Sequence, residues 1–461
     1  MKFKNIKLSE SLPDSLVNID EKKRSNLFTW RGQFSPQLIE YLLTNYASEG
    51  DVVFDPFLGS GTILFECALL GLKASGCEIN PAAVSFAKIY ELINKSKNIV
   101  MESLGIIETV VSKYSNNLPF LENRDINDFE PDLLNAFSNE KEEITRTILL
   151  SLITGLDFEA KKLDVKRINN VWGTLRSNVE NLPYSRVKLQ CYHRDARKTL
   201  LNGKSINFVL TSPPYINVFN YHQNYRKSIE KTGVDVLTVA KSEIGANRKF
   251  RQNRFLTVVQ YCMDMSQVFC ELGRICTDNA KIIFIVGRES HVRRTSFKNA
   301  ILISSVAKAC GFYLEGEQER LFTNKFGESI YEEILRFSIK NTTANNTLEE
   351  SRKIGQNALE DALSYCEEEV KNEIKEAIQK SNEIETSPIL FGEKIYKEIL
   401  RFKTSQIIPG KIIGNALKNG QQALKGDLLN CSQEVISEIE MAIEKTKTVG
   451  TSNFYNEGGI Y

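Results

Sequence analysis

The chain has 461 residues, enough for two or three domains, and the composition of an ordinary globular protein. Its 59 basic and 58 acidic residues give a formal net charge of +1, so a nucleic-acid surface would have to be local. Nine cysteines without a CxxC pair and only three histidines argue against a disulfide scaffold and a metal site. The N-terminus lacks the apolar core of a signal peptide, and no apolar stretch is long enough to cross a bilayer. We therefore expect a cytoplasmic protein without a membrane partner.

The first predicted helix follows a polar and aromatic segment, FTWRGQF, at residues 28–34. Ser35 suits the N-cap of this helix and Pro36 suits its first position. Phe34 could close over one end of a ligand bound at the strand that follows. A plain helix cap with core aromatic residues explains the same segment equally well.

Residues 51–93 are typical of a βαβ unit. An apolar strand at 52–54 runs into a glycine-rich turn, and an apolar-periodic helix follows at 63–70. A second short strand ends at Glu78, and Asn80 precedes another helix. The unit predicts two parallel strands joined by a crossover helix.

The turn between the first strand and helix reads DPFLGSGT, residues 55–62. Gly59 and Gly61 permit backbone angles forbidden to other residues and let a ligand approach the main chain. Asp55 ends the strand, where doubly wound sheets bind ligands, and Glu78, 17 residues after Gly61, can accept both hydroxyls of a ribose. The phosphate-binding patterns GxGxxG and GK[ST] are absent. The expected ligand is a nucleoside without a pyrophosphate.

S-adenosylmethionine fits this description, because it is a nucleoside that carries a sulfonium cation and a charged amino-acid end. Asp55 is a carboxylate that could favour that end, and Asp195, in HRDARKTL after a later strand, could receive the adenine amino group. A purely structural glycine turn becomes a weak alternative once Glu78 and these two acids are seen in series. The predicted cofactor contacts are Phe34, Asp55, Phe57, Gly59, Ser60, Gly61, Thr62, Glu78, Asp195 and Ala196.

Beyond residue 93 the pattern becomes mostly helical as far as residue 185, and strands then resume. Apolar strands are predicted within 187–196, 205–215 and 280–290, with a long helix at 255–275. Strands that alternate with helices indicate an α/β fold with a doubly wound, mainly parallel sheet. The helical block is then an insertion into that fold.

The second of these strands ends in TSPPY, residues 211–215. Proline has no backbone N–H to donate, so the strand must stop before Pro213, and a stiff corner follows. An exocyclic amine of a base is a poor nucleophile, and the Ser212 hydroxyl and the Pro213 carbonyl are suitable acceptors for its hydrogens. Tyr215 can stack on a base swung out of its helix. Ser212, Pro213, Pro214 and Tyr215 are the catalytic candidates; a Pro-Pro turn that merely closes a strand is the alternative.

A basic segment with interleaved aromatic residues, GANRKFRQNRF, occupies residues 245–255. Its candidates for phosphate contacts are Arg248, Lys249, Arg251 and Arg254. A second, less clearly placed candidate is GRESHVRRTSF at 287–297. For both segments a solvated loop is an equally good explanation.

The C-terminal part contains an internal repeat. FGESIYEEILRF at 326–337 recurs as FGEKIYKEILRF at 391–402, a shift of 65 residues, and a third copy begins near residue 451. Each unit predicts a strand and an amphipathic helix. A packing or dimerisation appendage is the favoured reading, and a substrate- or partner-recognition module is the alternative.

Taken together, these motifs resemble the amino-methyltransferase family that modifies exocyclic amines in DNA. DPFLGSGT is similar to the cofactor motif of the family, GCEINP and RDA to its second and third acidic motifs, and FSPQLIEYL to its helix-opening motif. TSPPY resembles its catalytic motif, in the serine form usual for cytosine-N4 enzymes, and FTNKFGESIYEEILRF resembles the closing hairpin of the domain. The resemblance covers roughly residues 25–90 and 185–340, with the cofactor motif before the catalytic one.

The resemblance implies a Rossmann-like class I methyltransferase that methylates the N4 amine of cytosine in double-stranded DNA, with base flipping. A cognate restriction endonuclease is a candidate partner. Adenine-N6 or RNA amino-methylation is the alternative, as is a non-catalytic nucleic-acid-binding protein on the same fold. The catalytic domain is expected at 1–93 and 185–340, and a helical insertion at 94–184 could recognise the target. The repeats belong to 341–461, with units at about 322–386 and 387–451.

Overall fold

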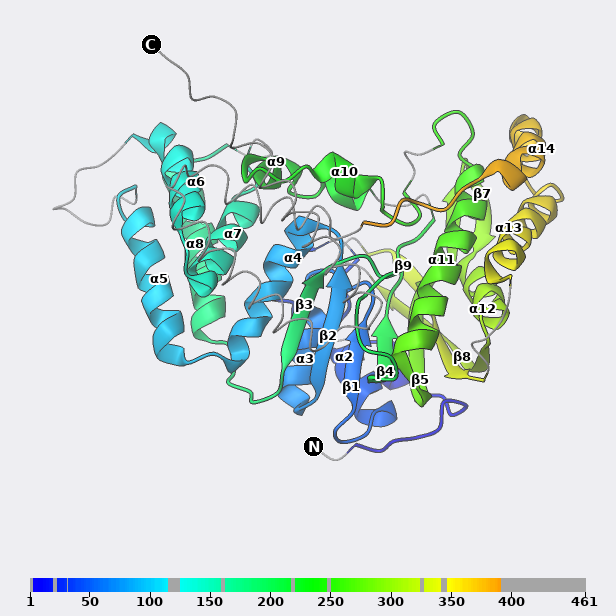
Figure 1. The fold of residues 1–461 in the computed structure, drawn as a ribbon, viewed down its shortest axis with the longest axis horizontal. Helices are drawn as coiled ribbons and strands as arrows, with labels where there is room; N and C mark the ends of the chain where they lie inside the picture. The colour runs from blue at the N-terminus through cyan, green and yellow to red at the C-terminus, as the bar shows by residue number, and fades with distance from the viewer. Residues whose placement is uncertain are drawn as a thin grey trace, which may run out of the picture.

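A seven-stranded sheet organises the computed structural model, which describes residues 3–19, 23–30, 32–114, 125–158, 162–216, 220–246, 250–323, 327–340 and 346–390. The strand order is β3-β2-β1-β4-β5-β9-β8. The five strands from β3 to β5 are parallel, and β9 and β8 are antiparallel to their neighbours. The strands are β1 (Val52–Asp55), β2 (Lys73–Glu78), β3 (Leu189–His193), β4 (Ile206–Thr211), β5 (Cys276–Gly287), β8 (Phe312–Thr323) and β9 (Ser329–Ile339). The expected α/β fold with a mainly parallel sheet is confirmed (Figure 1).

Both faces of this sheet are buried, and successive side chains of one strand enter different cores. In β1, Val53 belongs to one hydrophobic cluster and Phe54 to the other. In β4, Leu210 joins the cluster of Val53 and Val209 joins that of Phe54. Burial on both faces explains why these strands are apolar runs rather than alternating sequences. Helices must therefore cover both faces.

Helices on each side supply that cover (Figure 1). On one side are α2 (Pro36–Tyr46), α3 (Thr62–Leu70) and α4 (Pro81–Ala87), and on the other α11 (Leu256–Ile275) and α12 (Asn299–Ala309), on which α13 (Thr347–Ala362) packs in turn. Asn80 caps α4, since its side chain accepts a hydrogen bond from the Ala82 N–H at 3.0 Å. Ser35 occupies the N-cap position of α2, but its side chain makes no capping hydrogen bond.

The block expected as a helical insertion forms four helices beside β3 (Figure 1). They are α5 (Lys97–Val111), α6 (Phe129–Asn139), α7 (Glu143–Leu156) and α8 (Val165–Glu180). Buried hydroxyls tie the block to α4: Ser151 donates to the Ser85 carbonyl at 2.6 Å, and Ser85 to the Thr154 hydroxyl at 2.9 Å. These helices share a hydrophobic cluster with the sheet. Assigning them to target recognition stays a prediction.

The described copy of the C-terminal repeat holds more than one helix. Strand β9 is followed by α13 and by α14 (Lys371–Lys380), so the unit is one strand with two helices. The apolar stripe of the sequence is buried at Leu359, Val370 and Ile374, in the cluster that contains α11. The second copy, at 391–402, and the third lie outside the described residues.

The remaining described strands, β6 (Glu289–Val292) and β7 (Thr295–Lys298), form a separate antiparallel hairpin. The shorter described helices are α1 (Asp14–Val17), α9 (Arg226–Lys231) and α10 (Val236–Ala240), with 3-10 turns η1 (Lys88–Asn94), η2 (Ile126–Asp128), η3 (Tyr221–Gln223), η4 (Glu368–Val370) and η5 (Ser381–Glu383). In the part of the chain that the structure covers, the helices are too short or too polar to cross a bilayer.

Helices α11 and α13 cross at Gly355, and this contact generates a stability prediction. A Cβ built on Gly355 would lie 2.6 Å from the Cα of Val259, so Gly355→Ala should force the helices apart. We expect a loss of about 1–3 kcal/mol in the free energy of unfolding, measured with urea, although alanine is the better helix former.

The matched control is Gly105→Ala in α5, where no atom lies within 4 Å of the added Cβ. That change should stabilise the protein by about 0.5–1 kcal/mol. Equal effects of the two substitutions would show that helix propensity, not the close crossing, decides the outcome at Gly355.

Candidate active site

The glycine turn and the TSPPY corner leave the same edge of the sheet from neighbouring strands. Strands β1 and β4 pair in parallel, with Phe54 opposite Val209. Just beyond this pair, the Thr211 hydroxyl donates a hydrogen bond to Asp55 Oδ1 at 2.5 Å. Asp55 also accepts a bond from the Phe57 N–H at 2.9 Å. The last residues of the two strands are thus tied to each other and to the turn.

Glu78, at the end of β2, orders the glycine turn. Its Oε2 accepts a hydrogen bond from the Gly59 N–H at 2.8 Å, and its Oε1 accepts one from the Asn80 N–H at 2.7 Å. Gly59 and Gly61 have φ angles of 54° and 89°, which favour glycine. A Cβ on Gly61 would lie 2.9 Å from the Cα of Ala87, so this glycine is required for packing against the protein rather than for access to a ligand.

A pocket of about 880 Å³, counting the open space at its mouth, lies between the two loops. The predicted site residues that line it are Phe34, Phe57, Gly59, Ser60, Thr62, Glu78, Asp195, Ala196, Ser212 and Pro214. Those that do not line it are Asp55, Gly61, Pro213 and Tyr215. The structure therefore brings residues of the cofactor motif, both later acids and the catalytic corner around one space.

Asp195 is engaged by the protein itself. Arg197 donates to Asp195 Oδ2 at 2.6 Å and reaches Asp264 Oδ1 at 3.2 Å, and the Leu390 N–H contacts Asp195 Oδ2 at 3.2 Å. The Arg197 guanidinium also donates to the carbonyls of Ser387 and Pro388, at 2.8 and 2.9 Å. Contact of Asp195 with an adenine amino group stays a prediction, and any such contact uses a carboxylate that is already ion-paired.

The catalytic corner places Ser212 and Tyr215 differently. Ser212 lines the pocket and is partly exposed. Tyr215 is held from behind by two glycines. A Cβ on Gly245 would lie 2.8 Å from the Tyr215 carbonyl oxygen, and one on Gly287 would lie 3.3 Å from its ring. The Tyr215 ring thus lies next to the pocket rather than in its wall, and its stacking on a base stays a prediction.

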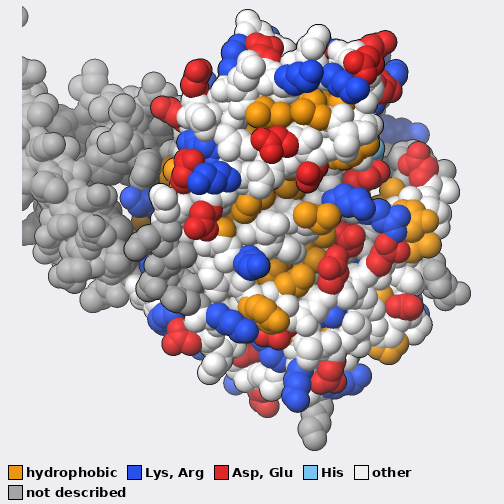
Figure 2. Space-filling model, turned by 90° about the vertical axis from the view of Figure 1, so that its right-hand side faces the viewer, with side chains coloured by type: hydrophobic (Ala, Val, Ile, Leu, Met, Phe, Trp, Pro, Cys, Tyr) orange, Lys and Arg blue, Asp and Glu red, His pale blue; other side chains and the backbone are white. Residues whose placement is uncertain are grey.

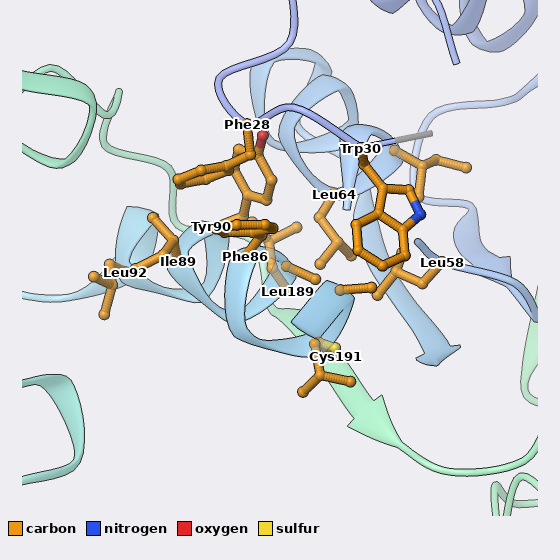
Figure 3. Packing of buried hydrophobic residues seen from close by; sticks show 14 of the residues in the cluster. Phe28, Trp30, Leu58, Leu64, Phe86, Ile89, Tyr90, Leu92, Leu189 and Cys191 are labelled. Carbon is orange, nitrogen blue, oxygen red and sulfur yellow. The ribbon is translucent and has the colours of Figure 1, made fainter. Parts of the chain in front are cut away.

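Several wall residues are absent from the sequence prediction. Trp30 lies beside Leu58 in the aromatic cluster next to the glycine turn (Figure 3), and both residues line the pocket. Gln33 also lines it and donates to the Ser60 hydroxyl at 2.5 Å. Glu243 and Tyr221 form the wall that faces Glu78. Of these residues, the sequence could have indicated only Trp30 and Gln33 as pocket residues, because they lie in the polar and aromatic segment before α2.

The two basic segments differ in whether their arginines are exposed or paired with acidic residues. Arg251 and Arg254 are exposed, whereas Arg248 and Lys249 lie outside the described residues. In the second segment, which forms the β6–β7 hairpin, Arg293 pairs with Glu373 at 3.0 Å and Arg294 with Glu367 at 3.6 Å. Among the side chains described on the face that carries α12 to α14, acidic and basic groups are intermixed (Figure 2). That face offers no single-sign patch for a phosphate backbone.

The polar lining of the pocket is acidic, which indicates the kind of ligand it fits. It includes the carboxylates of Glu78, Asp195 and Glu243, and the Arg194 side chain donates away from them to the Thr199 carbonyl at 3.1 Å. One oxygen of Glu243 is buried without a hydrogen-bond partner among the described residues. Carboxylates attract hydroxyl donors and cations and repel phosphates. The lining therefore fits S-adenosylmethionine, which has ribose hydroxyls and positive charge but no phosphate. No group of three or more possible metal ligands occurs within the described ranges.

Asp55 generates a prediction about pH. Burial raises its pKa from the ordinary 3.8 to about 7, against the opposing hydrogen bonds from Thr211 and Phe57. Because the folded-state pKa lies above the unfolded one, the folded protein retains the proton longer, and stability falls as the pH rises from about 4 to about 7. Asp55→Asn should make that fall shallower, by up to about 4 kcal/mol across the interval, in urea unfolding at stepped pH.

Asp278→Asn is the control, because the Asp278 side chain is 85% exposed and lies far along the chain in β5. It should leave the pH dependence as it is. If Asp55→Asn also leaves it unchanged, Asp55 ionises in the folded protein as it does in the unfolded chain.

Comparisons with known proteins agree with this geometry. Residues 2–89 match a family model described as DNA methylase. Over 356 residues the chain is 21% identical to the Type II methyltransferase M.BsoBI of Geobacillus stearothermophilus, covering 64% of this chain and 67% of that protein. It is 35% identical over 95 residues to M.MjaII of Methanocaldococcus jannaschii (19% and 18% covered), and 23% identical over 283 residues to M.AvaI of a Nostoc species (50% and 58% covered). The chain thus spans between a fifth and two thirds of these relatives. The part of the chain that carries the glycine turn, residues 2–89, is thus similar to the DNA methylase family, and the chain as a whole is similar in sequence to Type II methyltransferases.

Proposed function

We propose that the protein transfers a methyl group from S-adenosylmethionine to the exocyclic N4 amine of cytosine in double-stranded DNA. The observation that carries the proposal is that Ser212 and the glycine turn at Gly59 and Ser60 line one pocket, behind which Asp55 and Thr211 are hydrogen-bonded. The relatives M.BsoBI, M.AvaI and M.MjaII are named Type II methyltransferases. A site-specific activity and a cognate restriction endonuclease as partner are parts of the same proposal.

The cofactor would lie along the wall formed by the turn and the acids. S-adenosylmethionine supplies an electrophilic methyl group when it is bound. Glu78 accepts ribose hydroxyls with the lone pairs left free by the two backbone bonds, and Asp195 and Ala196 hold the adenine side. Phe34 covers the amino-acid end. The carboxylates that line the pocket favour the positive charge of the cofactor as a whole, whereas Asp55 itself is turned into the protein.

At the corner, acceptors rather than a strong base activate the amine. The Ser212 hydroxyl oxygen and the Pro213 carbonyl accept the two amine hydrogens and favour a more tetrahedral nitrogen, whose lone pair then points outward. The amine nitrogen would take the methyl carbon as its bond to sulfur breaks, with S-adenosylhomocysteine as the leaving group. The positively charged methylated amine would then lose its proton to water, so no group with a raised basicity is needed. The base reaches this corner only when it is flipped out of the duplex, and Tyr215 stacks on its face.

The test is to incubate the protein with radiolabelled cofactor and a mixture of duplex DNA and structured RNA, digest the nucleic acid and identify the labelled nucleoside. N4-methylcytosine from DNA is the expected product. N6-methyladenine would overturn the assignment of cytosine as the target base, while the assignment as an amino-methyltransferase would stand. Label in RNA would overturn the assignment of DNA as the substrate. Absence of label in every pool, with the cofactor bound, would favour a non-catalytic binding protein.

Removing the Ser212 hydroxyl separates catalysis from cofactor binding. Ser212→Ala should lower the rate of methyl transfer by about two to three orders of magnitude, the usual effect of losing one preorganised polar group at a reacting centre. Affinity for S-adenosylhomocysteine, measured by calorimetry, should change less than about threefold. Thr211→Val, next in the chain, should instead destabilise the fold, because it removes one of the two hydrogen bonds that the buried Asp55 accepts.

The basic segment predicts a salt effect. Replacing Arg248, Lys249, Arg251 and Arg254 together by glutamine should weaken DNA binding and flatten its dependence on salt, because each lost phosphate contact removes about 0.9 from the log–log slope. Arg293 and Arg294 provide the control pair, since both are engaged with glutamates. An unchanged slope in the fourfold variant would assign the phosphate contacts to other residues.

A further inference from the structure

A short segment after α10, residues 242–245, crosses the carboxyl edge of the sheet and meets every part of the site. Helix α10 lies above that edge (Figure 1). The Ser242 carbonyl accepts a bond from Arg197 at 3.3 Å, Glu243 and Ile244 line the pocket, and Gly245 packs on the Tyr215 backbone. The segment therefore holds Glu243 between the cofactor wall and the catalytic corner.

The Glu243 carboxylate is buried with one oxygen satisfied and one free. The residue is 5% exposed, and its Oε2 lies 2.7 Å from the Nδ1 of His222, which is 1% exposed. Its Oε1 has no hydrogen-bond partner among the described residues. A buried acceptor without a donor is costly, and native proteins seldom keep one unless a ligand or water satisfies it. His222 thus fixes one oxygen of the carboxylate of a residue that lines the pocket.

Glu78 and Glu243 line the same pocket and interact electrostatically. The Asn80 side chain donates to the Tyr221 carbonyl at 3.0 Å, which ties the turn of Tyr221 and His222 to the residues that follow Glu78. Burial raises the pKa of Glu78 to about 7 in spite of its backbone hydrogen bonds, and the nearby charge of Glu243 adds to the rise. Two carboxylates that share one wall repel each other unless hydrogen-bond donors lie between them.

We propose that Glu243 is a second ribose-binding residue, whose free Oε1 accepts a hydrogen bond from one hydroxyl of the cofactor ribose while Glu78 accepts one from the other. The assignment rests on the proposed function in one respect, namely that the pocket holds S-adenosylmethionine. His222 is a positioning residue that holds Glu243 and does not touch the ribose. The adjacent hydroxyls supply the two donors that the paired carboxylates need.

The experiment measures binding by calorimetry to the full chain and to Glu243→Gln, with two probes. Both probes carry the adenine and the ribose, and only S-adenosylhomocysteine carries the amino-acid end. Loss of a hydrogen bond to a charged acceptor should weaken both probes by the same factor, about ten- to a hundredfold. If only S-adenosylhomocysteine is weakened, Glu243 binds the amino-acid end and the ribose assignment is overturned; equal affinities for wild type and variant overturn it as well.

A second measurement is independent of any damage to the fold. The 2′-deoxy and 3′-deoxy forms of 5′-methylthioadenosine are titrated into both proteins, which gives a double-mutant cycle between protein and ligand. For one of the two forms, the loss seen with the wild type should disappear in Glu243→Gln. If, for both deoxy forms, the loss of affinity caused by the missing hydroxyl is the same in the variant as in the wild type, the contact between Glu243 and the ribose is refuted.

The control variant is Glu102→Gln on the exposed surface of α5, which should bind all probes as the wild type does. If Glu243→Gln lowers the melting temperature of the ligand-free protein, the measurements are made with Glu243→Asp instead. Aspartate keeps the negative charge, but its shorter side chain moves the carboxylate oxygen away from the ribose. A wild-type chain that binds neither probe would count against the cofactor and hence the proposed function. A wild type that binds both, with a variant that binds them equally well, would count against this assignment alone.

Discussion

The hydrogen bond between Asp55 and Thr211 is the contact on which the site depends. It joins the last residues of β1 and β4, the two strands that carry the glycine turn and the catalytic corner. Both partners are buried, so neither can exchange the bond for water. Without this hydrogen bond the glycine turn and the catalytic corner would still follow neighbouring strands, but no side-chain contact between the strand ends would fix the distance between them. A methyl transfer needs its donor and acceptor atoms at a set distance, which is why a rigid joint behind the pocket matters.

The acids of the site each constrain a different part of the backbone. Glu78 closes the glycine turn through Gly59 and Asn80, and Asp195 anchors Arg197. Each carboxylate therefore does structural work in addition to any contact with a ligand. Substituting them would alter shape and charge together, so losses of binding at these positions cannot be assigned to a single contact without a second probe.

Much of this architecture could be predicted from the sequence, because local pattern decides it. Apolar runs, the caps before α2 and α4 and the Pro-Pro stop after β4 are properties of short segments, and the structure has these elements close to the expected bounds. The division into domains and the roles of individual site residues stay predictions. Contacts between residues distant in sequence could not be predicted. The residues around Asp195 carry no pattern that indicates its connection to Asp264 or Leu390, and Glu243 lies in a segment without a recognisable motif. The sequence predicted that Gly61 lets a ligand approach the main chain, whereas the structure shows that it makes room for Ala87. That contact arises only when α4 packs against the turn, so the sequence could not predict it.

The contacts of Arg197 have a consequence for how the repeat should be understood. In sequence the first unit ends at residue 386, and the next begins with Ser387. In space Ser387 and Pro388 supply carbonyls to Arg197, and the Ser387 N–H donates to Asp264 at 2.7 Å, in the same ion-pair network that holds Asp195 at the pocket. The predicted boundary between the repeat units therefore falls inside a structural joint. Shortening the chain at that apparently natural junction would strip a buried guanidinium of two acceptors and loosen the rim of the cofactor site from the far end of the polypeptide.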